Sequence, residues 1–380
     1  MTTQSTTGYR DRIIGLDILR STAILAVLMA HSSDLLSKET TFKAAAFFSG
    51  FFGVELFFVL SGFLIGTVLM KTFNIPHLNT SSIGLFWIRR WFRTLPNYYL
   101  IIGVYNLLYH HITHTWVYSF KNNTSYFFFL QNIKPGMSAQ YFSVSWSLAI
   151  EEWFYLLFPL LLFIGQYLSK NRRLVLLSVT GIFIFIPLLL RAYFALTSAN
   201  TEWDNGFRKV MPLRLDGIGV GVLLAYIHYY HKTSLEKARF KLCGIGSCIL
   251  IAETLFWACP QFINTGLSSL LFKTIFFTCF SIGVALVLPA FYYLKISHKS
   301  LFGYAVTNIS LVSYSVYLLH PLVLLILPNM LAKRHLDNPI LHFALVWVMS
   351  FLLSWVLYQI FEKPTTNLRD KFKGRKYTAV

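Results

Sequence analysis

The sequence predicts an all-α protein, a polytopic bundle that crosses a membrane about ten times. Of its 380 residues, 56% are hydrophobic and 17% are aromatic, while only 13% are charged. A soluble protein would carry about 25% charged residues and would be unable to bury so much apolar surface. Apolar runs of about 20 residues, the length that a helix needs to cross a bilayer, recur along the chain. Together these observations exclude a soluble globular domain.

Each predicted span is an apolar run bounded by polar or basic residues. The first run is interrupted by Asp17 and Arg20, which argues against a cleavable signal peptide. We therefore divide the chain into a cytoplasmic N-terminal tail (1–12), one transmembrane domain (13–361) and a basic C-terminal tail (362–380). The predicted spans are 13–34, 47–70, 92–111, 146–167, 174–197, 210–230, 242–259, 269–293, 305–330 and 340–361.

The net charge of +18 is explained by the distribution of lysine and arginine. These residues gather in the tails and in alternate loops, around 71–93, 170–173, 232–241 and 295–299. Loops rich in lysine and arginine stay on the cytoplasmic side, so both termini are predicted to be cytoplasmic. The same distribution leaves no soluble basic surface for a nucleic acid, and we expect no nucleic-acid partner.

Metal binding and disulfides are not expected. The four cysteines lie in or beside apolar runs and have no CxxC spacing, which disfavours a disulfide scaffold or a cysteine-ligated metal. His110, His111 and His114 have the i, i+4 spacing of metal ligands, but no carboxylate accompanies them. A solvated or interfacial face is the alternative reading of these histidines, and we predict no metal site.

Ionisable residues in the first span share one helical face. Arg20 and His31 are eleven residues apart, which corresponds to three turns and a separation of roughly 16 Å along the helix axis. Such a face suits a long ligand that extends across the membrane, with a cation at one depth and an imidazole at another. Asp17 lies three residues before Arg20 and could pair with it. The alternative, purely structural reading is that Arg20 and Asp17 neutralise each other and that His31 only forms a hydrogen bond with a neighbouring helix.

An arginine group precedes the third span. Arg90 and Arg93 fall on one side of a helical turn, and Arg89 is adjacent. Guanidinium groups bind phosphate oxygens in a bidentate manner, so this group is a candidate phosphate site on the cytoplasmic side. An interfacial helix whose arginines contact anionic lipid headgroups is the competing interpretation.

Further polar residues lie within other spans. Glu151 and Glu152 point about 100° apart on a helix, so one carboxylate could face the interior and orient a histidine. Intramembrane ionisable groups are costly and therefore mark candidate functional positions, although each could also form a structural pair. The remaining candidates are Glu55, Arg214, Asp216, His320 and Glu362.

The chain resembles the acyltransferase-3 family of integral membrane O-acyltransferases. The resemblance extends from about residue 10 to 365 and includes the family's Arg-x10-His and Arg-x-x-Arg elements. Some family members carry an additional hydrolase-like extracytoplasmic domain, and this chain looks like a stand-alone member. Six segments carry the resemblance: GLDILR at 15–20 followed by His31, FGVELFFVLSGFL at 52–64, RWFR at 90–93, WSLAIEEWFY at 146–155, YLLHP at 317–321 and FEKP at 361–364.

The resemblance implies a multi-pass protein of the bacterial inner membrane that transfers an acyl group. The donor would be cytoplasmic acetyl-CoA or another acyl-CoA, used as a substrate, with no permanently bound cofactor. The acceptor would be a hydroxyl of an extracytoplasmic or lipid-linked carbohydrate, such as lipopolysaccharide O-antigen, exopolysaccharide or peptidoglycan. A second protein that completes the transfer, and membrane lipids, are the other expected partners.

The resemblance also implies roles for particular residues. His31 would be the general base, and Glu151 or Glu152 would orient it. Donor-binding residues would be Arg20, Arg89, Arg90 and Arg93, and the supporting residues would be Asp17, Glu55, Ser61, Trp146, Arg214, His320 and Glu362. Transfer through an acylated histidine or serine is an open alternative. A transporter or flippase with an intramembrane relay of histidine, glutamate and arginine is the alternative from another functional class.

Overall fold

The computed structural model describes residues 12–36, 39–73, 80–113, 120–136, 142–197, 202–258 and 266–369, and within these ranges it is helical with no β-strand. Short helical segments join or extend the long helices: η1 (Ser33–Leu35), α5 (Phe120–Phe127), η2 (Asp204–Arg208), η3 (Met211–Leu213), η4 (Tyr358–Glu362) and α14 (Lys363–Leu368). The long helices are α2 (Ile14–Ser32), α3 (Thr40–Phe73), α4 (Thr80–Thr113), α6 (Ser145–Leu168), α7 (Arg172–Thr197), α8 (Asp216–Tyr230), α9 (Lys232–Trp257), α11 (Gly266–Tyr292), α12 (Leu301–Ala332) and α13 (Pro339–Leu357).

Each of the ten predicted spans corresponds to one of these long helices. In the described part of the chain, eight helices are long and apolar enough to cross a membrane. Helices α4 and α8 fall outside that group. Helix α4 carries the predicted arginine group, and α8 has only 15 residues, which span about 22 Å of a core about 30 Å thick. The prediction of an all-helical membrane bundle is confirmed.

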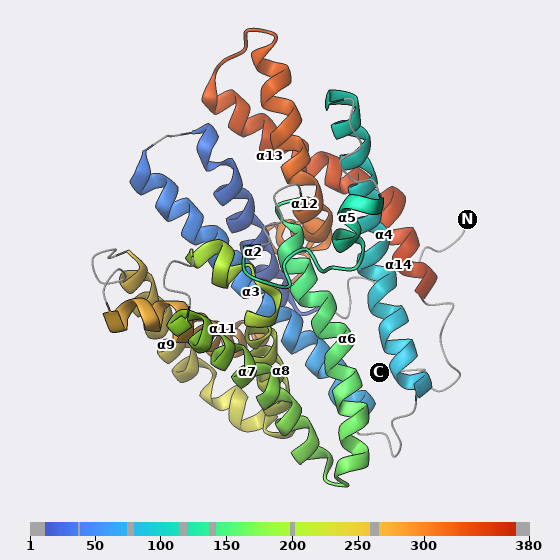
Figure 1. Cartoon of the computed structure of the whole chain (residues 1–380), viewed down its shortest axis with the longest axis vertical. Coiled ribbons are helices and arrows are strands. Elements are labelled where there is room, and N and C mark those ends of the chain that lie inside the picture. Colours follow the sequence, from blue (N-terminus) through green and yellow to red (C-terminus); the bar gives the residue numbers. More distant parts are fainter. Residues whose placement is uncertain are drawn as a thin grey trace.

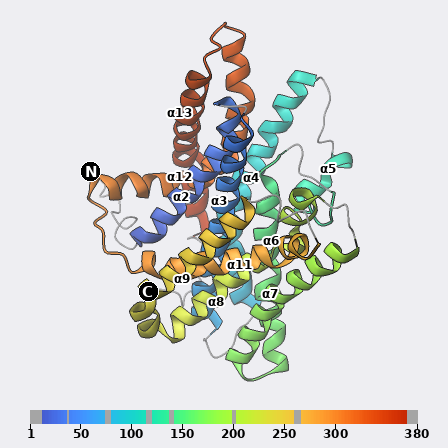
Figure 2. The same ribbon diagram turned by 90° about the vertical axis from the view of Figure 1, so that its left-hand side faces the viewer.

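Helices α2 and α3 pack along each other and run through the middle of the bundle (Figure 1). Helices α12 and α13 pack beside α2, whereas α7, α8, α9 and α11 form a second group against α3 (Figure 2). Helix α14 contacts α4, so the first residues after the predicted domain boundary at 361 still pack on the bundle. A space within the bundle is lined by residues of α2, α3, α4, α6 and α12.

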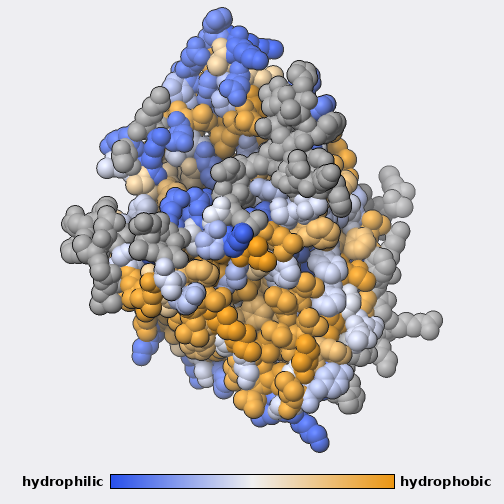
Figure 3. Space-filling model, in the orientation of Figure 1, coloured by the Kyte–Doolittle hydropathy of each residue, from blue (hydrophilic) through white to orange (hydrophobic). Residues whose placement is uncertain are grey.

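The surface has the distribution expected of a membrane protein. Hydrophobic side chains cover the lower half of the face shown in Figure 3, where α6 and α7 lie, and hydrophilic side chains gather at the tip between α12 and α13. Large apolar residues of α6 and α7 are exposed, including Leu168 and Leu189. Exposed apolar side chains over helices of this length are suited to contact lipid rather than water.

Close packing of α3 against α8 depends on glycine. A Cβ atom added at Gly62 would lie 2.0 Å from the carbonyl oxygen of Ile218, and one at Gly221 would lie 2.2 Å from that of Val59. No side chain fits at either position without movement of backbone. Small residues allow helix backbones to approach in a membrane, so Gly62 has a packing role.

A buried network of charges links α3, α7, α8 and α11. Arg214 forms an ion pair with Glu55, and Arg191 donates from Nη2 to Asp216 Oδ2 at 2.8 Å. All four side chains have 0% exposure, and Ser281 also donates to Glu55 at 3.1 Å. Buried charges require such partners because desolvation is costly. The predicted supporting residues Glu55 and Arg214 thus form a structural pair.

Candidate active site

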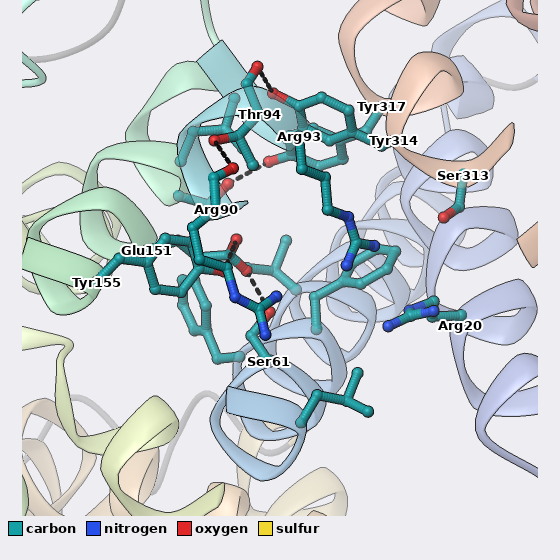
Figure 4. Close-up of a pocket in the computed structure, with 16 residues that line it drawn as sticks. Arg20, Ser61, Arg90, Arg93, Thr94, Glu151, Tyr155, Ser313, Tyr314 and Tyr317 are labelled. Atoms are coloured by element: carbon teal, nitrogen blue, oxygen red, sulfur yellow. Dashed lines mark hydrogen bonds between the residues drawn. The ribbon is translucent and has the colours of Figure 1, made fainter. Parts of the chain in front are cut away.

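Three arginines line one cavity in the middle of the bundle. Arg20 of α2 and Arg90 and Arg93 of α4 surround a space of about 100 Å³, which we call the arginine cavity (Figure 4). The predicted spacing of Arg90 and Arg93 places both side chains on the same cavity. Arg89 does not line this cavity.

The arginine cavity carries an excess of positive charge. The predicted pair between Asp17 and Arg20 is not formed. Instead, Arg12 donates from Nε to Asp17 at 3.0 Å and forms an ion pair with it. Within the described ranges, no carboxylate forms a salt bridge with Arg20, Arg90 or Arg93. Guanidinium groups that form no salt bridge with a carboxylate are suited to bind phosphate.

A polar wall faces these arginines. Ser61 Oγ and Tyr155 Oη each donate a hydrogen bond of 2.8 Å to Glu151, one to each carboxylate oxygen. All three side chains line the arginine cavity. Both carboxylate oxygens of Glu151 therefore accept hydrogen bonds from Ser61 and Tyr155, and Glu151 does not contact His31. The prediction that Glu151 orients His31 is wrong.

A second cavity of about 310 Å³ contains His31, and we call it the histidine cavity. His31 is exposed to this space, and Trp146 also lines it. Val54 and Tyr317 line both cavities, so the two spaces meet at these side chains. The helical geometry of α2 places His31 roughly 16 Å from Arg20 along the axis. The cavities consequently follow one another along α2 and α3.

His31 is held by a second histidine. Its Nδ1 lies 2.6 Å from Nε2 of the fully buried His320, and Nδ1 of His320 lies 2.9 Å from the carbonyl oxygen of Val316. A carbonyl only accepts, so His320 donates from Nδ1, and its Nε2 in the neutral ring is an acceptor. His31 then donates from Nδ1, which leaves a lone pair on its Nε2. This arrangement suits His31 as a proton acceptor.

Tyr317 is fixed at the boundary between the cavities. Its phenol oxygen lies 2.5 Å from Ser147 Oγ and donates to the carbonyl oxygen of Val144 at 3.1 Å. The ring lies 6.1 Å from that of His320, measured between centroids. Tyr317 thus joins α12 to the start of α6 at the point where the two cavities meet.

Two further cations, Arg208 and Lys209, line the histidine cavity and are not marked by any sequence motif. The Arg208 guanidinium lies 4.8 Å from the centre of a ring of Trp146 and forms an ion pair with Asp204. Burial favours the neutral acid of Asp204, but Arg208 and Lys209 outweigh it and hold the pKa of Asp204 below its ordinary value. Both cations lie at the end of η2, in a connecting segment without a sequence motif, so only the fold brings them to this cavity. Arg214 donates to the carbonyl oxygen of Arg208 at 3.3 Å.

The remaining candidates lie elsewhere. Glu152 faces a separate groove and does not contact His31, so neither predicted carboxylate orients that histidine. Glu362 is buried and accepts a hydrogen bond of 2.5 Å from Ser315, but it lines neither cavity. His110 and His111 lie in the last turn of α4, and His114 lies outside the described residues.

The fold and the cavities define a helical membrane protein in which an arginine-lined cavity adjoins a cavity that contains a paired histidine. The chain belongs to the acyltransferase-3 family, described as an acyltransferase domain, which matches residues 13–359. No solved structure gives a significant match.

Curated relatives carry related names. The chain is 27% identical to the peptidoglycan O-acetyltransferase OatA of Listeria monocytogenes, over 98% of this chain and 59% of the relative. It is 24% identical to the O-acetyltransferase OatA of Staphylococcus aureus, over 94% of this chain and 58% of the relative. A putative peptidoglycan O-acetyltransferase of Bacillus subtilis, YrhL, is 34% identical over 44% of this chain and 26% of the relative. The chain therefore spans less than two thirds of the length of these relatives.

Proposed function

We propose that this protein transfers an acetyl group from acetyl-CoA to a hydroxyl of a cell-wall glycan. The observation that carries the proposal is the junction of the arginine cavity with the histidine cavity at Val54 and Tyr317. One cavity offers cations for a nucleotide, and the other offers a base for a hydroxyl. Family membership and the names of the relatives support the same reaction.

The donor would bind in the arginine cavity. Arg20, Arg90 and Arg93 would bind the phosphates of coenzyme A, and the flexible arm that carries the thioester would extend towards His31. The distribution of lysine and arginine supports a cytoplasmic position for this end of the bundle. Acetyl-CoA would therefore enter from the cytoplasm, and the acceptor would approach from the opposite side.

His31 would act as the general base. Its Nε2 would take the proton of the acceptor hydroxyl while that oxygen attacks the thioester carbonyl carbon. The tetrahedral intermediate would then collapse with cleavage of the C–S bond, and the imidazolium would return the proton to the coenzyme A sulfur. Positive charge from Arg208 and Lys209 on the same cavity would favour the developing oxyanion. General base catalysis of this kind contributes about 10²–10⁴-fold to the rate.

The acceptor would be peptidoglycan, since two of the relatives carry that substrate in their names. O-antigen and exopolysaccharide, which the family resemblance also implies, are acceptors to be compared in the same assay. A second protein that completes the transfer remains part of the prediction. Its contribution would appear as transfer that depends on a membrane extract.

Reconstituted protein tests the proposal. Purified wild type and His31→Ala would be compared in proteoliposomes with radiolabelled acetyl-CoA and peptidoglycan fragments, with and without membrane extract. We expect label in the glycan with wild type and at least a hundredfold less with His31→Ala, if both fold equally. Absence of both acetyl-CoA binding and transfer, with protein that is demonstrably folded, would contradict the acyltransferase proposal and favour a transporter.

A further inference from the structure

A third hollow lies between α4 and α6, on faces of these helices that do not line the two cavities. It has a volume of about 180 Å³ and shares no lining residue with either cavity. Helices α4 and α6, the last residue of α5 and the segment that follows it form its walls. We call it the aromatic groove, since its lining includes Trp91, Tyr99, Phe127, Phe128, Phe129 and Trp153.

The wall of the aromatic groove is held in place by hydrogen bonds from aromatic side chains. Tyr99 Oη donates to the carbonyl oxygen of Phe127 at 2.8 Å, and Trp153 Nε1 donates to that of Phe129 at 3.0 Å. Phe129 has a φ of 57°, a conformation that is unfavourable for a bulky residue. The polar atoms of Tyr99 and Trp153 are used in these hydrogen bonds. A ligand in the groove would therefore contact their aromatic rings.

Glu152 supplies a single acidic group to the aromatic groove. The residue has 7% exposure, and its Oε2 has no hydrogen-bond partner. None of the described residues that line the groove is lysine, arginine or histidine. A buried acceptor without a partner is unfavourable and rare, which points to a ligand that donates a hydrogen bond to this oxygen.

We infer that the aromatic groove binds the ammonium headgroup of a membrane lipid of the phosphatidylethanolamine type. A carboxylate together with the negative faces of aromatic rings attracts an organic cation, and a primary ammonium also donates to Oε2. The lipid origin follows from the exposure of the groove's edge: Phe128 is 61% exposed and Tyr99 is 38% exposed. Apolar rings at the edge of a groove between membrane helices are suited to contact acyl chains. The site is independent of the proposed acetyl transfer.

Native mass spectrometry of the detergent-purified protein tests this site without any acyl donor. Phosphatidylethanolamine would be titrated beside N-acetyl-phosphatidylethanolamine, which has the same chains but no positive charge. A hydrogen bond to a charged group corresponds to roughly 10- to 100-fold in affinity, so wild type should prefer the charged lipid by about that factor. Glu152→Gln should abolish the preference, whereas Glu253→Gln, at an acid on α9 outside the groove, should keep it.

A second variant tests the site even if Glu152→Gln fails to fold. Phe128 is largely exposed, so Phe128→Ala should fold normally and bind phosphatidylethanolamine more weakly. Equal retention of the charged and neutral lipids by wild type would overturn the assignment. An unchanged preference in Glu152→Gln together with an unchanged affinity in Phe128→Ala would also overturn it. Competition by free ethanolamine at the concentration of the lipid would overturn the lipid source of the ammonium.

Discussion

The hydrogen bond between His31 and His320 makes a quantitative prediction for His320→Ala. The 2.6 Å contact is the interaction that selects the tautomer of His31 with a free Nε2. A neutral hydrogen bond contributes about 1 kcal/mol, or about fivefold in rate. The substitution also releases the ring from its partner, so we expect kcat to fall roughly 10- to 100-fold, within the limit of about 10²–10⁴-fold set by complete loss of a general base.

The assay is the initial rate of acetyl transfer at varied acetyl-CoA concentration. KM for acetyl-CoA should not change, because His320 does not line the arginine cavity. His320→Gln keeps a hydrogen-bond acceptor and should recover part of kcat, which would separate positioning from general loss of structure. The double variant with His31→Ala should be no slower than His31→Ala alone. A kcat within twofold of wild type, or additive losses in the double variant, would refute the proposed pairing.

Three further predictions concern binding and stability. Arg90→Ala or Arg93→Ala should raise KM for acetyl-CoA by roughly 10- to 100-fold, measured in the same assay, and an effect on the acceptor KM alone would contradict a phosphate site. Arg214→Ala leaves a buried carboxylate unpaired and should destabilise the fold by about 3–5 kcal/mol; an unchanged thermal unfolding midpoint in detergent would refute this. Gly62→Ala places a Cβ 2.0 Å from a carbonyl oxygen of α8 and should lower the yield of folded protein in size-exclusion chromatography. Gly84→Ala, where nothing lies within 4 Å, is the matched control, and equal yields would contradict the packing role.

The helices could be predicted from the sequence because bilayer thickness fixes the length of an apolar run. Helical periodicity was also sufficient to bring Arg90 and Arg93 to one cavity, since both lie on a single helix. Contacts between distant segments could not be obtained in this way. His320 lies 289 residues from His31, and spacing along a helix indicates only which neighbours share a face.

Local spacing also misassigned a nearby ion pair. Asp17 and Arg20 are three residues apart, but Asp17 binds Arg12 from the segment before the helix. Arg208 was missed because a charged residue in a connecting segment has no periodic signal, and only the packing of η2 brings it to the histidine cavity. In each case the physical determinant is tertiary contact, which no local pattern contains.

The central claim is that donor and acceptor meet from opposite ends of one path through the bundle. It is tested most directly with proteoliposomes of a single protein orientation, in which acetyl-CoA and the glycan acceptor are placed in separate compartments. We predict that label crosses to the acceptor only when acetyl-CoA is on the side of the arginine cavity, and that His31→Ala stops the crossing. Equal transfer with acetyl-CoA on either side, or transfer only when both substrates share a compartment, would contradict the account.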